Sequence, residues 1–222
     1  MLQIVSTADG SKTIFNSEVG ESYHSKHGAV QESRHVFIGA GLAYFSDRSN
    51  VQEISILEVG FGTGLNFLLS ADFCESHQIK LDYTGIEAYP LSPDMIGQTG
   101  YEEYIKPKTW QCFQEHYSDC LAQCVALNPQ YSLQIALCKL AEFSSAKHYD
   151  IIYFDAFASM HQPEMWTETA IGPLIKLLNP GGVFVTYAIT GQLRRMLKGL
   201  GLEVQKAPGA PGKREMLRAI RH

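Results

Sequence analysis

A glycine-rich loop between an apolar run and a helical pattern places the strongest constraint on how this chain can fold. Residues 56–68 read "ILEVGFGTGLNFL". Its glycines are Gly60, Gly62 and Gly64. An apolar strand of residues 53–59 leads into the loop, and a helical stretch of residues 64–76 follows it. Such a loop presents backbone N–H groups and a helix N-terminus at the carboxyl end of a parallel sheet, so the stretch predicts an α/β fold with a ligand beside the glycines.

Further apolar runs repeat this strand pattern along the chain. The remaining predicted strands are residues 81–87, 131–137, 149–156, 182–188, 202–207 and 214–220, and the predicted helices between them are 109–126, 164–178 and 191–200. Continuous apolar runs are typical of strands buried on both faces of a parallel sheet. The last two strands are joined by "PGAPG", which is too short for a crossover helix, so they pair as an antiparallel hairpin. Seven strands with a C-terminal antiparallel hairpin predict the Rossmann-like fold of class I methyltransferases.

The 222 residues are enough for one substantial domain, and no linker divides them. We expect residues 1–50 to form an N-terminal extension on the ligand cleft, with a small hairpin of residues 2–5 and 12–15 and a helix over 32–45. Residues 88–130, between the second and third strands, are more than one helix needs. This insertion either caps the cleft or decorates the surface, and the sequence leaves both readings open.

The cysteines and histidines indicate no metal site and no disulfide frame. The five cysteines include no C-x-x-C pair, and the histidines are scattered without ligand spacing. We therefore expect reduced thiols in a cytoplasmic protein. No apolar run reaches the roughly 18 residues of a membrane span, and the N-terminus does not resemble a secretory signal. The sequence says nothing about the oligomeric state.

Charge is distributed unevenly along the chain. The net charge is −5, but residues 192–222 carry +6 and the first 191 residues carry −11. A basic end on an acidic body suggests contact with a polyanion, while a solvated C-terminal face explains the charge count equally well.

The spacing of the glycines distinguishes two classes of cofactor. A dinucleotide loop has the pattern G-x-G-x-x-G, and counted from Gly60 its third glycine position is Leu65. The observed order, Glu58 followed by glycines at 60, 62 and 64, is typical of an S-adenosyl-L-methionine loop, which passes under the amino-acid and ribose portions. We predict that cofactor, held by Glu58, Gly60, Phe61, Gly62, Gly64 and Asn66.

Glu87 ends the second strand, 23 residues after Gly64. A carboxylate accepts hydrogen bonds from both ribose hydroxyls at once, so Glu87 completes the predicted cofactor site.

Asp155 stands at the carboxyl end of the fourth strand, in "YDIIYFDAFASMHQPEMW", where open α/β sheets bind ligands. A carboxylate beside a reactive methyl group suits methylation of an amine, because an ammonium must lose a proton before it can attack. We predict Asp155 as the catalytic residue, and its other reading is a helix N-cap. Phe157, Trp166 and Tyr187 lie near the same strand ends and would either pack a flat base or belong to the core.

Several segments together resemble the methyltransferase domains of the tRNA-modifying MnmC family. These segments are "ESYHSKHGAVQESRHVFIGAGL" (21–42), "ILEVGFGTGLNFL" (56–68), "GIEAYPLS" (85–92), "DAFASMHQPEMWT" (155–167), "LNPGGVFVTYAITGQLRRMLKGLGLEV" (178–204) and "PGKREML" (211–217). They cover most of the chain in order. The first, fourth and last are more specific than the glycine loop, which any class I methyltransferase carries.

The resemblance implies methyl transfer to the aminomethyl group of 5-aminomethyl-(2-thio)uridine at the tRNA wobble position, with Asp155 beside the amine. It implies contacts to substrate or tRNA from residues in these segments, namely Tyr23, Phe157, Trp166, Arg194, Arg195, Lys213 and Arg214. MnmC proteins also contain a flavin-dependent oxidase half. We expect no such half in these 222 residues, so the aminomethyl substrate comes from another enzyme.

The chain departs from the family pattern at two places. The loop "DAFAS" has Ala156 and Ser159 where the family has Gly and Pro. The third strand ends in Leu137 and Cys138 where an acid for the adenine amino group is expected, so adenine recognition falls to the backbone or to Glu142. Two alternatives therefore stand beside tRNA methylation: a class I methyltransferase for a small amine, and a protein that binds the cofactor without turnover.

Overall fold

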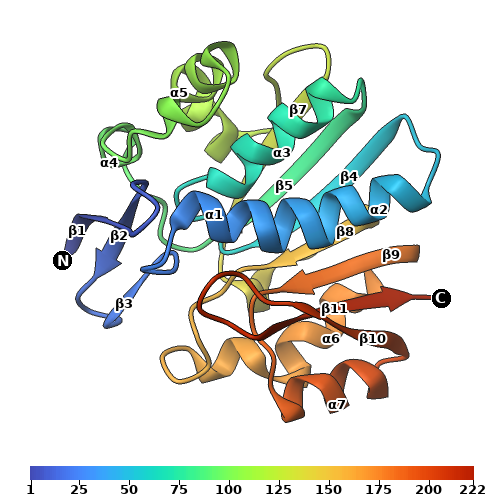
Figure 1. The fold of residues 1–222 in the computed structure, drawn as a ribbon. Helices are drawn as coiled ribbons and strands as arrows, with labels where there is room; N and C mark the ends of the chain where they lie inside the picture. Colours follow the sequence, from blue (N-terminus) through green and yellow to red (C-terminus); the bar gives the residue numbers. More distant parts are fainter.

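A sheet of eight strands forms the centre of the molecule in the computed structural model, which describes residues 1–222 (Figure 1). In spatial order the strands are β10 (Leu202–Pro208), β11 (Glu215–Arg221), β9 (Leu178–Thr186), β8 (Tyr149–Phe154), β4 (Glu53–Val59), β5 (Lys80–Glu87), β7 (Tyr131–Leu137) and β6 (Val125–Ala126). The run from β9 to β7 is parallel, and β11 pairs antiparallel with both β9 and β10. The predicted fold class is confirmed. The seven predicted strands are present, and the two-residue edge strand β6 adds an eighth.

The strand order reverses direction at β4. From β4 the chain continues to β5 and β7 on one side, and then returns to β8 and β9 on the other side. Ligands in open α/β sheets bind outside the carboxyl ends of the strands at such a switch point. The loops that follow β4, β5 and β8 meet there, because Asp155 N–H donates to the Val59 carbonyl at 2.9 Å.

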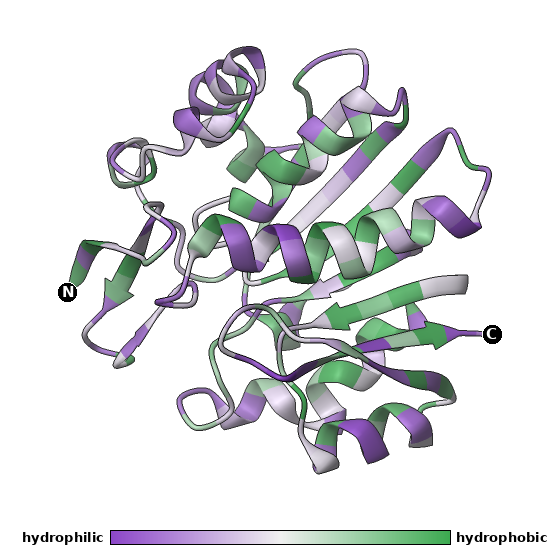
Figure 2. Cartoon of the chain, viewed as in Figure 1, coloured by the Kyte–Doolittle hydropathy of each residue, from purple (hydrophilic) through white to green (hydrophobic).

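Two layers of helices cover the sheet. On one face lie α3 (Leu65–Ser76), α5 (Pro107–Ala122) and a long N-terminal helix, and on the other lie α6 (Glu168–Lys176) and α7 (Gly191–Gly199) (Figure 1). Successive side chains of one strand point to opposite faces of the sheet, and each face has its own hydrophobic core. Ile56 belongs to the larger of these two cores and Leu57 to the smaller. The buried positions of the central strands are therefore mostly apolar on both faces, and Figure 2 shows a largely hydrophobic β9.

The long N-terminal helix runs through α1 (Ala29–Ser33), a π-helical stretch η1 (Arg34–Ala43) and α2 (Tyr44–Arg48). It extends the predicted helix 32–45 at both ends. The helix has a glycine at position 41 because it packs closely on the sheet: a Cβ on Gly41 would lie 2.9 Å from Val185 and 3.1 Å from Tyr153. The glycine lets the helix approach β8 and β9 closely.

The N-terminal strands β1 (Leu2–Ser6), β2 (Lys12–Asn16) and β3 (Glu21–Ser22) form a separate antiparallel sheet. The predicted hairpin of residues 2–5 and 12–15 is confirmed. The insertion holds α4 (Pro93–Gly97), a short 3-10 helix η2 (Tyr101–Glu103), α5 and β6. Two more 3-10 turns, η3 (Leu140–Glu142) and η4 (Pro163–Trp166), follow β7 and β8. No helix of the molecule has both the length and the apolar character of a membrane span.

Candidate active site

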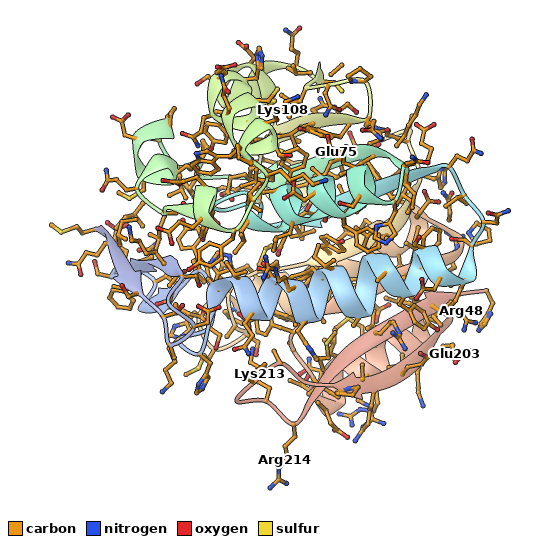
Figure 3. The ribbon with its side chains drawn as sticks, turned by 45° about the horizontal axis from the view of Figure 1, so that its top comes forward. Arg48, Glu75, Lys108, Glu203, Lys213 and Arg214 are labelled. Carbon is orange, nitrogen blue, oxygen red and sulfur yellow. The ribbon has the colours of Figure 1, made fainter.

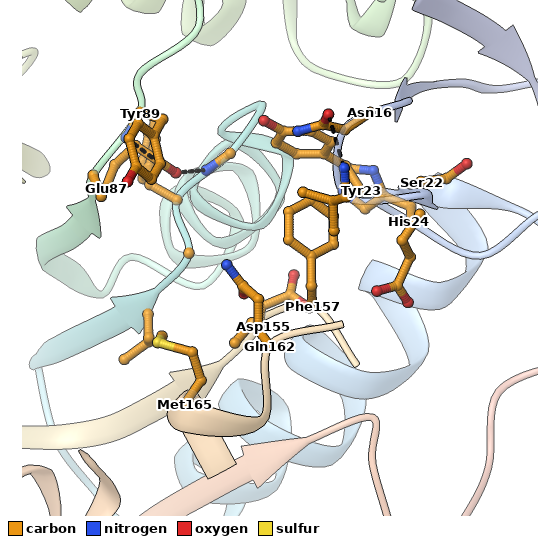
Figure 4. Close-up of a pocket in the computed structure, with 18 of the residues that line it drawn as sticks. Asn16, Ser22, Tyr23, His24, Glu87, Tyr89, Asp155, Phe157, Gln162 and Met165 are labelled. Carbon is orange, nitrogen blue, oxygen red and sulfur yellow. Dashed lines mark hydrogen bonds between the residues drawn. The ribbon is translucent and has the colours of Figure 1, made fainter. Parts of the chain in front are cut away.

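A cavity of about 1310 Å³ opens at the carboxyl ends of β4, β5 and β8. The loops after these three strands form its base, and residues 15–26 of the N-terminal sheet form one side. Figure 4 shows Glu87 and Tyr89 on one side, Asn16, Tyr23 and His24 on the other, and Asp155 with Phe157 between them. The switch point of the sheet therefore holds a large cavity.

The glycine loop reaches the cavity through its backbone. Gly60 has φ 83° and Gly62 has φ 52°, a region that side chains rarely adopt. A Cβ on Gly60 would lie 2.5 Å from the Asp155 carbonyl oxygen. The Phe61 ring is 2% exposed and packs against Phe67 and Phe113, so it turns into the core. The peptide groups of the loop, and not the Phe61 ring, face the ligand space.

Glu87 is held against this loop. Its Oε2 accepts from Gly62 N–H at 2.9 Å, and its Oε1 accepts from Tyr89 N–H at 2.9 Å (Figure 4). A carboxylate has about four lone-pair sites, so each oxygen keeps acceptor capacity for a further donor. Glu87 lines the cavity at the position predicted for a ribose contact.

Asp155 lies at the cavity base and is partly buried. Burial raises the pKa of its carboxyl to about 8, and the nearby Glu32 carboxylate adds to the rise. A hydrogen bond from Asn66 Nδ2 to Asp155 Oδ2, at 2.9 Å, and the Lys213 ammonium act in the opposite direction. The carboxyl therefore exchanges a proton near neutral pH.

The structure corrects two of the predicted contacts. Glu58 is 0% exposed and lies beneath the loop, outside the cavity lining, where its Oε1 accepts from Asn66 Nδ2 at 2.7 Å and its Oε2 from Tyr83 OH at 2.8 Å. Trp166 is 7% exposed and also lies outside the lining, and its Nε1–H donates to the Phe157 carbonyl at 2.8 Å. Both side chains support residues of the cavity wall from behind.

The N-terminal segment contributes more to the site than the sequence indicated. Tyr23 and Phe157 form an edge-to-face pair with ring centroids 5.2 Å apart at the cavity. Glu21 Oε2 accepts from Ala158 N–H at 2.9 Å and so fastens the "DAFAS" loop to the N-terminal sheet. Burial lowers the pKa of His24 to about 4. Glu21 and His24 have no spacing signal that singles them out, apart from their place in a family-like segment.

Comparison with known proteins gives a family. Residues 106–222, more than half of the chain, match the model of a family described as S-adenosyl-L-methionine-dependent methyltransferase. The chain belongs to this methyltransferase family. The predicted cofactor and reaction class are thereby confirmed.

Similar curated proteins are bifunctional MnmC proteins, named for the biosynthesis of tRNA 5-methylaminomethyl-2-thiouridine. The protein of Chromobacterium violaceum is 29% identical, over 89% of this chain and 31% of its own length. The protein of Leptospira borgpetersenii is 32% identical, over 88% of this chain and 31% of its own length. The chain thus spans about a third of the length of these relatives.

Solved structures agree on the fold. MNMC2 from Aquifex aeolicus superposes with a TM-score of 0.79 over 99% of this chain and 70% of that chain, at 24% identity. CalS10, an amino pentose methyltransferase from Micromonospora echinaspora with bound S-adenosyl-L-methionine, reaches a TM-score of 0.50 at 13% identity, over 91% and 93% of the two chains. At these identities the likeness concerns the fold alone.

The insertion supports the methyltransferase cavity from behind and does not cover it. Of residues 88–130, only Ala88 and Tyr89 line the cavity. Tyr101 OH donates to Thr63 Oγ1 at 3.3 Å, and a Cβ on Gly64 would lie 2.7 Å from the Phe113 ring. Side chains from the insertion therefore buttress the glycine loop, and the N-terminal sheet flanks the opening.

The end of β7, where an adenine-binding acid is missing, also lines the cavity. Residues 138–141 contribute to the wall, but Glu142 does not. Glu142 Oε2 instead accepts from Lys139 N–H at 3.3 Å across the 3-10 turn. Of the two options left open for adenine, the backbone remains, because Glu142 lies outside the cavity lining.

The basic residues of the C-terminal region divide into two groups. Lys213 turns inward: its Nζ lies 3.0 Å from Glu32 Oε1 and 4.0 Å from the centroid of the Tyr187 ring. Arg194 and Arg195 on α7, and Arg214 in the hairpin loop, form no ion pair, and Figure 3 shows Arg214 pointing away from the molecule. Lys213 is therefore paired with Glu32 while it also lines the cavity, and its predicted phosphate contact stays a prediction.

Proposed function

We propose that this chain transfers the methyl group of S-adenosyl-L-methionine to the primary amine of a 5-aminomethyl-(2-thio)uridine at the wobble position of tRNA. The observation that carries the proposal is Asp155, a carboxyl with a pKa raised to about 8 at the base of the methyltransferase cavity. Such a group takes up a proton in the pH range in which an amine must lose one.

The cofactor fits beside the glycine loop. The positive-φ glycines leave no Cβ between their peptide groups and the cavity, and Glu87 offers acceptors for the ribose hydroxyls. The backbone of residues 138–141 borders the space for adenine. When bound, S-adenosyl-L-methionine supplies an electrophilic methyl group.

The chain's own contribution is to bind the amine, orient it and manage its proton. Asp155 Oδ1 accepts no hydrogen bond from the protein, so it is free for a substrate ammonium. The carboxylate takes the proton that the ammonium releases, and the neutral amine then holds the lone pair that attacks the methyl carbon. Glu21 and Glu32 add negative charge to the wall and favour a cationic substrate.

The size of the cavity supports a large acceptor. Pockets for small molecules occupy roughly 300–1,000 Å³, and this cavity of about 1310 Å³ exceeds that range. Cofactor and one flipped-out nucleotide together account for such a volume better than the cofactor and a small amine. Tyr89, which is 72% exposed and lines the cavity, offers a face on which a base can stack.

A tRNA partner is supported by the names of the relatives and by the unpaired arginines. Arg194, Arg195 and Arg214 lie on α7 and in the hairpin loop, and Arg214 lines a second, smaller pocket that shares Tyr187 and Lys213 with the main cavity. Guanidinium groups there are placed to contact phosphates around a bound nucleotide. The tRNA must already carry the aminomethyl group, so an earlier reaction that produces this primary amine has to precede the methylation.

Methylation assays on defined substrates test the proposal. Labelled methyl donor is incubated with the protein and either tRNA bearing aminomethyluridine, unmodified tRNA, or a free small amine. We expect incorporation only into the modified tRNA, with a loss of about 100-fold or more in Asp155→Asn. Incorporation into small amines alone would replace tRNA as the acceptor. Binding of the cofactor without any incorporation would indicate a protein without turnover.

A further inference from the structure

A chain of hydrogen bonds runs from the core to Asp155. Tyr83 OH donates to Glu58 Oε2 at 2.8 Å, and the Asn66 amide nitrogen donates to Glu58 Oε1 at 2.7 Å and to Asp155 Oδ2 at 2.9 Å. The four side chains come from β5, β4, the first turn of α3 and the end of β8. One amide group therefore joins a carboxyl at the cavity base to a carboxyl that no ligand reaches.

The orientation of the Asn66 amide follows from this arrangement. Its nitrogen has two hydrogens, and each meets one carboxyl oxygen. The reversed amide would place its oxygen against both carboxyls and leave the nitrogen without those acceptors. Asn66 Oδ1 is buried and has no partner, although Asn66 itself lines the cavity. The Asn66 side chain thus donates a hydrogen bond to each of the two carboxyl groups, while its own Oδ1 accepts none.

We propose that Asn66 is the positioning residue for Asp155, and that Glu58 acts through Asn66 as its anchor. Asn66 holds Asp155 Oδ2 and leaves Oδ1 free for the substrate ammonium. This inference rests on the proposed function for its chemistry, but the positioning itself is a property of the protein without substrate. It also replaces the predicted cofactor contact of Glu58 with a different role.

The surroundings of Glu58 show how it connects to the cavity. Its only hydrogen-bond donors are the Asn66 amide and the Tyr83 hydroxyl, and it forms no ion pair. Burial and the Asp155 charge raise the pKa of Glu58 well above its usual value, whereas the hydrogen bonds from Asn66 and Tyr83 act in the opposite direction. The hydrogen-bonded link from Glu58 to Asp155 is the Asn66 amide.

Two substitutions separate positioning from cofactor binding. Asn66→Ala frees Asp155, so we expect kcat to fall by about 100-fold, as for other displaced catalytic groups, while the affinity for S-adenosyl-L-methionine changes little. Glu58→Gln keeps an acceptor for Asn66, so it lowers kcat much less than Asn66→Ala does. Glu58→Leu removes the acceptor and behaves like Asn66→Ala. The matched control is Asn179→Ala, which breaks a 2.8 Å bond to Asp150 near the start of β8, at the end of the strand remote from Asp155.

A readout without substrate makes the test independent of the tRNA reaction. In a carbon NMR titration of the labelled Asp155 carboxyl, Asn66→Ala raises the pKa of Asp155, because a donor to its ionised form is lost. Both Glu58 variants lack a charge at this position, so Glu58→Leu gives a higher pKa of Asp155 than Glu58→Gln, because only leucine removes the acceptor that holds Asn66. If Asn66→Ala shifts nothing, or weakens cofactor binding as much as kcat, the positioning role is overturned. If the two Glu58 variants give the same pKa of Asp155, the anchoring role of Glu58 is overturned. The pKa measurements do not depend on whether the tRNA is methylated.

Discussion

At the scale of single residues, the carboxyl proposed for catalysis, Asp155, carries an energetic cost in the ligand-free protein. Its carboxyl ionises against burial and against Glu32, and only one hydrogen bond from Asn66 and the Lys213 charge oppose that cost. Sites that tune a group for proton transfer often lose stability in this way. The position of Asp155 after a buried strand predicted its place at the cavity, but the sequence could not predict the pKa, which depends on residues distant in the chain.

Asp155→Asn should therefore stabilise the ligand-free protein at alkaline pH. The folded pKa of about 8 lies above the ordinary value of 3.8, so the wild type loses stability as pH rises between these values. Asparagine has no such loss. Thermal unfolding should show a gain of about 5 °C at pH 8.5 that shrinks toward pH 4, since one kcal/mol moves the midpoint of a chain this size by about 2–4 °C. The exposed Asp47→Asn is the control. A gain independent of pH would refute the assignment.

At the scale of elements, the glycine loop and the end of β8 form one unit, because Gly60 leaves room for the Asp155 carbonyl. Strands were predictable from the sequence because each central strand packs into both cores and its buried positions are mostly apolar. The sequence did not predict which way the side chains point at the ends of strands and helices. Glu58, Trp166 and Lys213 belong to the right elements, but tertiary packing turns the first two beneath the wall and pairs the third with Glu32.

Gly60→Ala tests this unit. The new Cβ would lie 2.5 Å from the Asp155 carbonyl and must push the β8 end away, so cofactor binding and methyl transfer should both fall by at least about 10-fold. Gly181→Ala is matched, because Gly181 has a similar φ of 79° but nothing within 4 Å of its Cβ position. Gly181→Ala should lower the stability of the protein by about 1 kcal/mol, the cost of backbone strain, and leave cofactor binding unchanged. Calorimetry with S-adenosyl-L-methionine compares the two, and equal effects would show that contact with Asp155 is irrelevant.

At the scale of the whole molecule, the C-terminal hairpin and α7 lie at one end, and α5 with its exposed Lys108 lies at the other (Figure 3). The charge asymmetry of the sequence indicated a polyanion surface, but Arg218 and Arg221 bond to backbone carbonyls and Lys206 pairs with Glu215. The surface is therefore smaller than the eight basic residues suggested, and its remaining members include Arg194, Arg195 and Arg214.

Charge reversal should locate this surface. Arg195→Glu and Arg214→Glu should each weaken tRNA binding and lower the slope of log affinity against log salt by about 1. Lys108→Glu, at the far end, should leave the slope unchanged. Filter binding over a salt series measures both quantities. A slope change for Lys108→Glu equal to that for Arg214→Glu would place the tRNA elsewhere.

The central claim is that the protein transfers the methyl group of S-adenosyl-L-methionine to the amine nitrogen of aminomethyluridine at the wobble position of tRNA. Mass spectrometry of nucleosides, after incubation of the modified tRNA with protein and deuterated S-adenosyl-L-methionine, tests it directly. We predict one deuterated methyl group on the side-chain nitrogen of that nucleoside, absent with Asp155→Asn. Label on another nucleoside, or none on the tRNA while the cofactor binds, would contradict the account.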